Sequence, residues 1–314
     1  LWTFRCEDEV RGSINYDNGN LYLGSYDNNL YALQATDGLF LWKYPTEGGV
    51  VGRPAFWQSQ VLVGSEDRSF YAIHQKNGYL LWKHETNGPI RSSPVVSDGH
   101  AFIGSDDGYL YGFNLASTSP VWKFDAGSEI RSTPAVANNA IYFGTEAGEF
   151  FSLDFKGRMT WRFTAKRSLT SSPLFSDGVV CFGSLDSTLY ALDARTGWAI
   201  WRFRMGKGTV SSPAKHDNCV IIGSADGSLY CLDAVSAREI WRFSGDSQFS
   251  GSPVVDKDSV YCGAADGTLY CVDFRTGRLR WKFRTEGSIT SRPVIYNDIL
   301  YFGSADHLVY ALMA

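Results

Sequence analysis

The chain has 314 residues, of which 44% are hydrophobic and 20% are charged, an ordinary composition for a globular protein. Its formal net charge of −4 gives no overall attraction to nucleic acid or to an anionic membrane. No apolar run approaches the roughly 18 residues of a membrane-spanning helix. We therefore expect neither a nucleic-acid partner nor a membrane span. The 32 glycines and the 15% aromatic content favour many short strands joined by tight turns.

A tryptophan recurs at a nearly constant interval along the whole chain. The interval is 40 residues, shortened once to 39 by a single deletion before the fifth position. The positions are Trp2, Trp42, Trp82, Trp122, Trp161, Trp201, Trp241 and Trp281. The frame that ends at Trp201 reads Ala-x-Asp-x-x-Thr-Gly-x-x-x-Trp and returns, partly worn, before most of the others. A period of about 40 to 50 residues is typical of propeller blades, so we predict one closed ring instead of two domains.

Each repeat is predicted to contain four β-strands, here called A to D from the channel outward. Runs of Val, Ile, Tyr, Phe and Trp are bounded by Gly, Asn, Asp and Pro. In the sixth repeat these runs are 210–214, 219–223, 228–232 and 239–243. No segment has a sustained helical period. The predicted fold class is all-β, an eight-bladed β-propeller with four antiparallel strands per blade. The predicted blades are 10–44, 50–84, 90–124, 130–163, 169–203, 210–243, 249–283, and 289–314 completed by 1–5.

The last repeat lacks its own outer strand. Nothing follows its strand C, whereas Leu1–Arg5 matches the strand-D pattern of the other repeats. We therefore predict that the N-terminal strand completes the C-terminal blade. Closing the ring in this way removes the exposed sheet edges that promote aggregation.

The turn between strands B and C repeats as Gly-Ser-x-Asp-Gly. Its last position also holds Asn28, Arg68, Ser187 and His307. This variety favours a bulged turn with one positive φ angle over a two-residue turn that needs two. The bulged form places Cys262 and Cys271 out of register, so we predict no disulfide there. We expect the six cysteines to be small core residues, which favours a reducing compartment; they are Cys6, Cys181, Cys219, Cys231, Cys262 and Cys271.

The recurring tryptophan has a predicted structural role. A large aromatic ring on strand D can lie against the next blade, between its strand-B glycine and its small strand-C residue. Such contacts would fasten the blades to one another.

These motifs resemble those of the pyrroloquinoline quinone (PQQ)-type repeat family. The likeness rests on the tryptophan frame, the strand-A Ser-Ser-Pro of residues 92–94, 171–173 and 211–213, and the Gly-Ser-x-Asp-Gly turns, and it covers the whole chain. The resemblance implies a propeller fold. It leaves function open, because that family includes quinone-dependent alcohol dehydrogenases, the outer-membrane β-barrel assembly lipoprotein, and sensor domains of bacterial Ser/Thr kinases.

The dehydrogenase branch fits this sequence poorly. Those enzymes carry two adjacent cysteines over the cofactor, and no Cys-Cys dipeptide occurs here. A calcium ion needs six or more oxygens at one place, whereas the acidic residues here are spread over the turns of all repeats. We expect no enzyme activity, no cofactor and no metal.

Arginines mark one arc of the predicted channel mouth. They occupy the positions one or three before the strand-A proline in blades 8 and 1 to 4, and they are Arg11, Arg53, Arg91, Arg131 and Arg292. Two interpretations remain open. The guanidinium groups could bind a carboxylate, a phosphate or an acidic peptide. Alternatively, they pair with loop acids on the same face, such as Glu7, Glu9, Glu47, Glu129 or Glu286.

Other candidate residues give weaker signals. Trp57 and Trp198 depart from the repeat and are either partner contacts or isolated surface aromatics. We expect the five histidines (74, 84, 100, 216 and 307) to be ordinary strand or loop residues. Asp154, Asp193, Asp233 and Asp273 should organise their turns through side-chain bonds to the backbone.

The sequence thus favours a monomeric, non-catalytic propeller that binds a protein partner or a small anionic ligand at one channel mouth. Because the chain begins at Leu1 inside a repeat, we expect it to belong to a larger protein such as a bacterial Ser/Thr kinase. One alternative is an outer-membrane β-barrel assembly-type scaffold lipoprotein, which would be periplasmic. The other is a minimal PQQ-dependent oxidoreductase.

Overall fold

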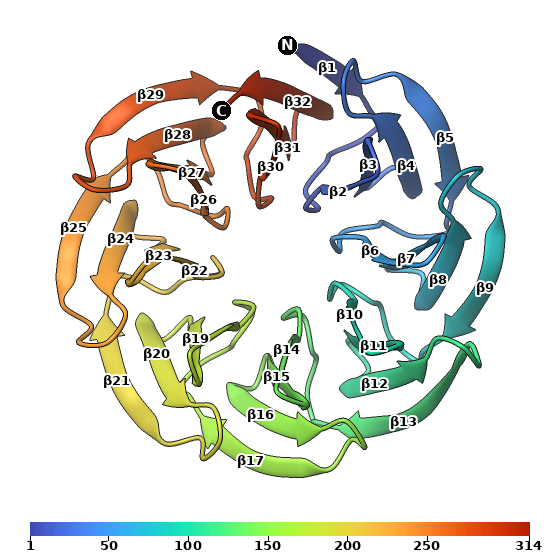
Figure 1. Cartoon of the computed structure of the whole chain (residues 1–314), viewed down its shortest axis with the longest axis horizontal. Coiled ribbons are helices and arrows are strands. Elements are labelled where there is room, and N and C mark those ends of the chain that lie inside the picture. The colour runs from blue at the N-terminus through green and yellow to red at the C-terminus, as the bar shows by residue number, and fades with distance from the viewer.

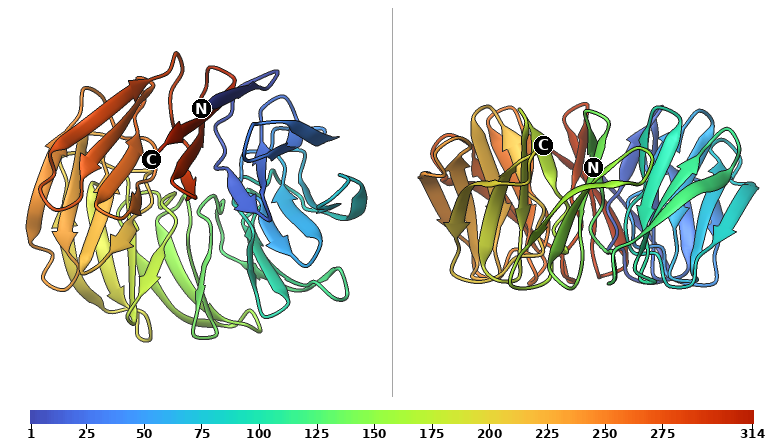
Figure 2. Two further views of the ribbon diagram at one scale, coloured as in Figure 1. Left: turned by 45° about the horizontal axis from the view of Figure 1, so that its top comes forward. Right: turned by 90° about the horizontal axis from the view of Figure 1, so that it is seen from below.

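Eight four-stranded antiparallel sheets form a closed ring in the computed structural model, which describes residues 1–314 (Figure 1). The predicted all-β, eight-bladed fold is confirmed. The strands of each blade run between two faces of the ring, and the turns lie on those faces (Figure 2). The chain has no helix that is long and apolar enough to cross a membrane.

The first four blades use residues 15–164. Blade 1 comprises β2 (Asn15–Asp17), β3 (Asn20–Gly24), β4 (Asn29–Gln34) and β5 (Phe40–Pro45). Blade 2 comprises β6 (Ala55–Trp57), β7 (Gln60–Gly64), β8 (Ser69–His74) and β9 (Leu80–Glu85). Blade 3 comprises β10 (Val95–Ser97), β11 (His100–Gly104), β12 (Tyr109–Asn114) and β13 (Ser119–Asp125). Blade 4 continues to residue 164 with β14 (Ala135–Ala137), β15 (Ala140–Gly144), β16 (Glu149–Asp154) and β17 (Met159–Thr164).

The other four blades complete the ring. Blade 5 comprises β18 (Leu174–Ser176), β19 (Val179–Gly183), β20 (Thr188–Asp193) and β21 (Ala199–Arg204). Blade 6 comprises β22 (Ala214–His216), β23 (Cys219–Gly223), β24 (Ser228–Asp233) and β25 (Glu239–Ser244). Blade 7 comprises β26 (Val254–Asp256), β27 (Ser259–Gly263), β28 (Thr268–Asp273) and β29 (Leu279–Arg284). Blade 8 comprises β30 (Val294–Tyr296), β31 (Ile299–Gly303), β32 (Leu308–Met313) and the N-terminal β1 (Trp2–Arg5).

The two ends of the chain close the ring in blade 8, as predicted. Strand β1 pairs antiparallel with β32, so that Trp2 lies opposite Ala311 and Arg5 opposite Leu308. The N-terminal ammonium of Leu1 extends this pairing by donating to the Ala311 carbonyl at 2.8 Å. Segments more than 300 residues apart in the sequence therefore share one sheet (Figure 1).

The inner strand of each blade is shorter than predicted. In blade 6 it was expected to begin at Val210, whereas β22 begins at Ala214. Proline cannot donate to a ladder, and the residues before it form bonds elsewhere. The Ser212 N–H, for example, donates to the Ser252 hydroxyl of the next blade at 2.9 Å. The segment before the proline therefore bridges blades instead of extending the sheet.

The turns between strands B and C have the predicted bulged form. Positive φ angles occur at the last turn position only, from 65° at Asn28 to 87° at Gly148, and not at the residue before it. This turn places Cys262 opposite Tyr270, and Cys271 opposite Tyr261. All six cysteines are free, and Cys262 and Cys271 are out of register, as the bulged turn predicted.

The recurring tryptophans do pack against the next blade, but not where the sequence suggested. The Trp42 indole lies against Gly78, in the turn between strands C and D of blade 2, and donates to the Gln75 carbonyl at 3.1 Å. The strand-B glycine of that blade, Gly64, instead makes room for Ile90, which leads into blade 3. The predicted contact with the strand-B glycine is therefore wrong. Six indoles donate to the carbonyl 33 residues later: Trp2, Trp42, Trp122, Trp161, Trp201 and Trp241.

Candidate functional site

The five arc arginines do not form one cluster. Arg11, Arg91 and Arg131 stand three residues before the strand-A proline or its equivalent and pair with carboxylates of the loops. Arg53 and Arg292 stand one residue before the proline and line the central channel instead. The two positions were expected to share a face by strand geometry. They do not, because the segment before the proline is not part of the sheet.

Two of these three arginines, Arg91 and Arg131, form a chain of ion pairs at the channel mouth. Arg91 pairs with Glu66 at 2.8 Å and also with Asp106. Arg131 pairs with the same Asp106 at 3.1 Å and with Glu146 at 3.2 Å. Asp106 has a side chain only 7% exposed, and it is shared by two guanidinium groups.

The partner acids are mostly not those that the sequence suggested. Arg11 does pair with the expected Glu9, whereas Glu66, Asp106 and Glu146 were not foreseen. These three residues occupy the third position of the turn between strands B and C in blades 2, 3 and 4. The other blades carry Tyr, Leu or Ala there. An acid in this turn position, in the same blades as the arginines, was the available signal.

The two channel arginines have no carboxylate partner. They line a cavity of about 450 Å³, none of whose 17 lining residues is acidic. Arg53 donates from Nη2 to the Asn15 side-chain oxygen at 2.6 Å, while its Nε is buried without an acceptor. Burial, aided by the nearby Arg292 charge, lowers the pKa of Arg53 to about 10. The guanidinium therefore stays protonated at neutral pH.

Arg292 is desolvated although part of its surface touches water. It is among the exposed residues by surface area, yet burial lowers the pKa of its guanidinium. Arg292 lines the central cavity, where the neighbouring blades surround it. Its side chain makes no hydrogen bond or ion pair with another residue; only its backbone N–H does, to Ser13.

The other sequence candidates lie apart from the channel. Trp57 packs beside the core of blades 2 and 3, whereas Trp198 is 78% exposed. Burial lowers the pKa of His84, whose ring packs edge-on against Phe113. The aspartates before the C–D turns organise those turns as predicted; Asp193 accepts the N–H groups of Arg195 and Thr196. No group of three or more His, Cys, Asp or Glu side chains is arranged to hold a metal ion.

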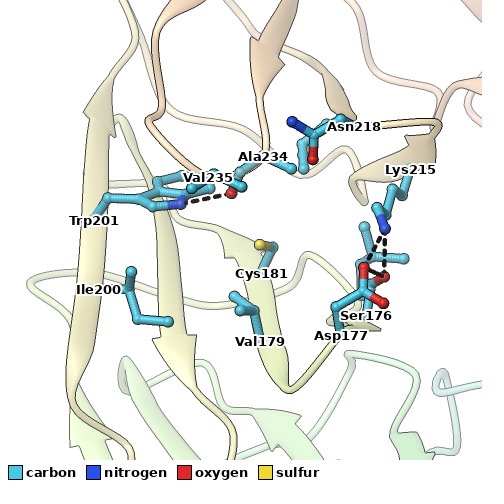
Figure 3. A pocket seen from close by; sticks show the side chains of 12 residues that line it. Ser176, Asp177, Val179, Cys181, Ile200, Trp201, Lys215, Asn218, Ala234 and Val235 are labelled. Atoms are coloured by element: carbon cyan, nitrogen blue, oxygen red, sulfur yellow. Dashed lines mark hydrogen bonds and ion pairs between the residues drawn. The ribbon is translucent and has the colours of Figure 1, made fainter.

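An apolar groove between blades 5 and 6 was missed by the sequence reasoning. It has a volume of about 180 Å³, and eight of its 12 lining residues are hydrophobic. Ile200 and Val235 lie on the side of Trp201, and Cys181 and Val179 lie between them and Lys215, as Figure 3 shows. Lys215 closes one end, where its ammonium contacts Ser176 at 2.9 Å and also Asp177. The dashed bond at the other end joins the Trp201 N–H to the Ala234 carbonyl, 3.0 Å apart (Figure 3).

The repeats provide internal comparisons for this groove. The grooves between blades 1 and 2 and between blades 4 and 5 lie in the same place but are mostly polar. Where the groove of blades 5 and 6 has Val235, the corresponding residues of the other blades are Thr36, Lys76, Ala116, Lys156, Arg195 and Arg275. Val235 is 72% exposed and Ile200 is 51% exposed. Val235, a large apolar residue open to solvent, thus stands where four of the other blades have a cation.

Comparisons with known proteins agree with this fold. The chain resembles the crystal structure of BamB from Moraxella catarrhalis, with a TM-score of 0.86, 18% identity, and coverage of 100% of this chain and 99% of that one. It also resembles the computationally designed Ika8 protein, with a TM-score of 0.88, 18% identity, and coverage of 99% and 98%. No curated protein sequence matches it. The family model described as outer membrane protein assembly factor BamB matches residues 1–114, 77–186, 106–211 and 185–314. Because these matches span the whole chain, the protein belongs to this family of PQQ-type repeat propellers.

Proposed function

We propose that this protein is a non-catalytic interaction propeller and that the groove between blades 5 and 6 receives an apolar side chain of a protein partner. The family match supports a scaffold role. The observation that carries the location is the replacement of a turn cation by the exposed Val235 beside an apolar groove. Exposed apolar surface that is set among polar repeats is typical of protein contact sites.

The size of the groove suits one large side chain. Its volume of about 180 Å³ slightly exceeds that of an engineered apolar cavity of about 150 Å³ that binds benzene. A leucine or phenylalanine side chain of the partner would fill it. Burying one such side chain contributes about 1.5–3 kcal/mol, so loss of the contact should weaken binding about tenfold or more.

A narrower proposal assigns the propeller to a larger protein such as a bacterial Ser/Thr kinase, in which it acts as a sensing domain. The assembly-scaffold alternative predicts a partner in the cell envelope instead. Finding a kinase domain in the same reading frame would support the first, and crosslinking to an envelope protein would support the second. The oxidoreductase alternative predicts an absorbance change and thermal stabilisation on adding quinone and calcium; the non-catalytic proposal predicts neither.

Site-specific photo-crosslinking tests the groove directly. A photoreactive residue is placed at position 235 and, as a matched control, at position 275 of the corresponding turn in blade 7. In cells that produce the protein, we expect a defined adduct from position 235 and none from position 275. The adduct should be lost when Ile200→Glu places a charge in the groove. Equal adducts from both positions, or an adduct that survives Ile200→Glu, would exclude the groove as the contact site.

A further inference from the structure

One residue from each blade forms a ring around the central channel, here called the channel ring. Each member stands directly before the strand-A proline, or before Ile14 in blade 1, and all eight line the same cavity. The members are Ser13, Arg53, Ser93, Thr133, Ser172, Ser212, Ser252 and Arg292. Six of them are hydroxyl residues and two are arginines.

The serines of the channel ring retain free donors. Five serine oxygens each accept a backbone N–H from the preceding blade at 2.8–3.0 Å, and they belong to Ser13, Ser93, Ser172, Ser212 and Ser252. None of these five hydroxyls donates to another protein group. A hydroxyl that already accepts one bond still has its own O–H to give. Five O–H groups therefore remain available to a molecule in the channel.

The arginines add positive charge that the protein does not neutralise. The Arg292 charge lies close enough to help lower the pKa of Arg53, and neither arginine has a carboxylate partner. Burying a charge without a partner is unfavourable. Arg91 and Arg131, which belong to the same arc of arginines, each form ion pairs with two carboxylates. The contrast shows that the channel pair lacks the neutralisation that its neighbours receive.

We propose that the channel ring binds a small dianion, either a phosphate group or a dicarboxylate, between Arg53 and Arg292. Guanidinium groups match both kinds of oxyanion by forked hydrogen bonds, and the buried Arg53 Nε offers a donor that lacks an acceptor. The ring hydroxyls supply further donors around the bound anion. The two ligand charges balance the two arginine charges. The site is separate from the groove of the proposed function and does not depend on it.

Calorimetry and thermal unfolding test this site with defined anions. Inorganic phosphate and succinate are compared with acetate and chloride at equal ionic strength. We expect one or both dianions to bind and to raise the melting temperature of the wild type more than acetate and chloride do. The stronger of the two identifies the source. If neither dianion exceeds chloride, the proposal is wrong.

Three variants locate the effect. Arg292→Gln should weaken dianion binding by at least about tenfold, and it should fold normally because the native side chain has no protein partner. Arg53→Gln should act in the same direction. Arg131→Gln, which alters an ion pair at the mouth, should bind as the wild type does. If Arg292→Gln keeps wild-type affinity, or if Arg131→Gln loses as much as Arg292→Gln, the assignment to the channel fails.

Discussion

The contact between each tryptophan and the turn glycine of the next blade can be tested by adding one methyl group. Gly277 has a φ of +69°, and a Cβ placed there would lie 2.8 Å from Cδ2 of Trp241. That indole is only 8% exposed and donates to the Phe274 carbonyl at 2.7 Å. Gly277→Ala therefore combines an unfavourable backbone conformation with a steric clash against a docked ring.

A second glycine isolates the steric part. Gly99 has nearly the same φ, +71°, but nothing lies within 4 Å of a Cβ placed there. Gly99→Ala should cost only the conformational term, about 1–2 kcal/mol for an L-residue in the left-handed region. Gly277→Ala should cost about 1–3 kcal/mol more, as overpacking does. The upper limit is about 3–5 kcal/mol, the cost of losing a buried tryptophan side chain.

Urea unfolding of both variants measures the difference, and a double-mutant cycle assigns it. In a Trp241→Ala background the clash is absent, so Gly277→Ala should cost no more than Gly99→Ala. If the two glycine variants are equally stable in the wild-type background, or if the excess cost persists without Trp241, the indole does not fasten these blades.

Three further predictions concern charge, pH and ring closure. Asp106→Asn should lower the free energy of unfolding by about 1–3 kcal/mol, because two guanidinium groups lose their shared carboxylate; an unchanged urea midpoint would contradict this. Burial disfavours the charged form of Asp226, but bonds from the Tyr230 hydroxyl and from the backbone outweigh it and hold its pKa below the usual value. The resulting stability is present above the unfolded pKa of about 3.9 and is lost as the pH falls through the folded pKa, so Tyr230→Phe should reduce the loss of stability between pH 6 and pH 3. Deleting Leu1–Arg5 should expose the edge of β32 and cause association in size-exclusion chromatography; a monomeric, equally stable product would contradict the need for closure.

The architecture could be predicted from the sequence because each blade repeats the same local requirements. The tryptophan interval gave the number of blades, and the strand-D pattern of Leu1–Arg5 located the closure. The variety at the last turn position indicated the bulged turn, since residues such as Arg68 adopt one positive φ more readily than two. Each of these features depends on residues within one repeat or on residues that lie a fixed number of positions away in the next repeat.

The functional surfaces were harder to predict because they depend on which neighbours the ring brings together. Two-residue alternation placed Arg91 and Arg53 on one face, but it applies to strands, and the segment before the proline is not one. The groove joins Cys181 of blade 5 to Val235 of blade 6, residues with no shared motif. Its only sequence signal was an apolar residue in a turn position that is basic in several other blades.

The channel arginines lack the acceptor that the serines of the channel ring use between blades, which bears on why arginine stands at these two positions. Where the channel-ring residue is serine, its oxygen accepts an N–H from the preceding blade, as Ser93 does from Arg53 at 2.8 Å. Arginine has no acceptor, so blades 2 and 8 cannot return this bond to blades 1 and 7. The backbone N–H groups of Ser13 and Ser252 accordingly lack the interblade bond that Ser172 and Ser212 make. Serine at position 292 would restore one contact and remove a desolvated charge, whereas serine at position 53 would also remove the bond to Asn15 of blade 1. Ring stability therefore does not account for Arg292, and the proposed anion site does.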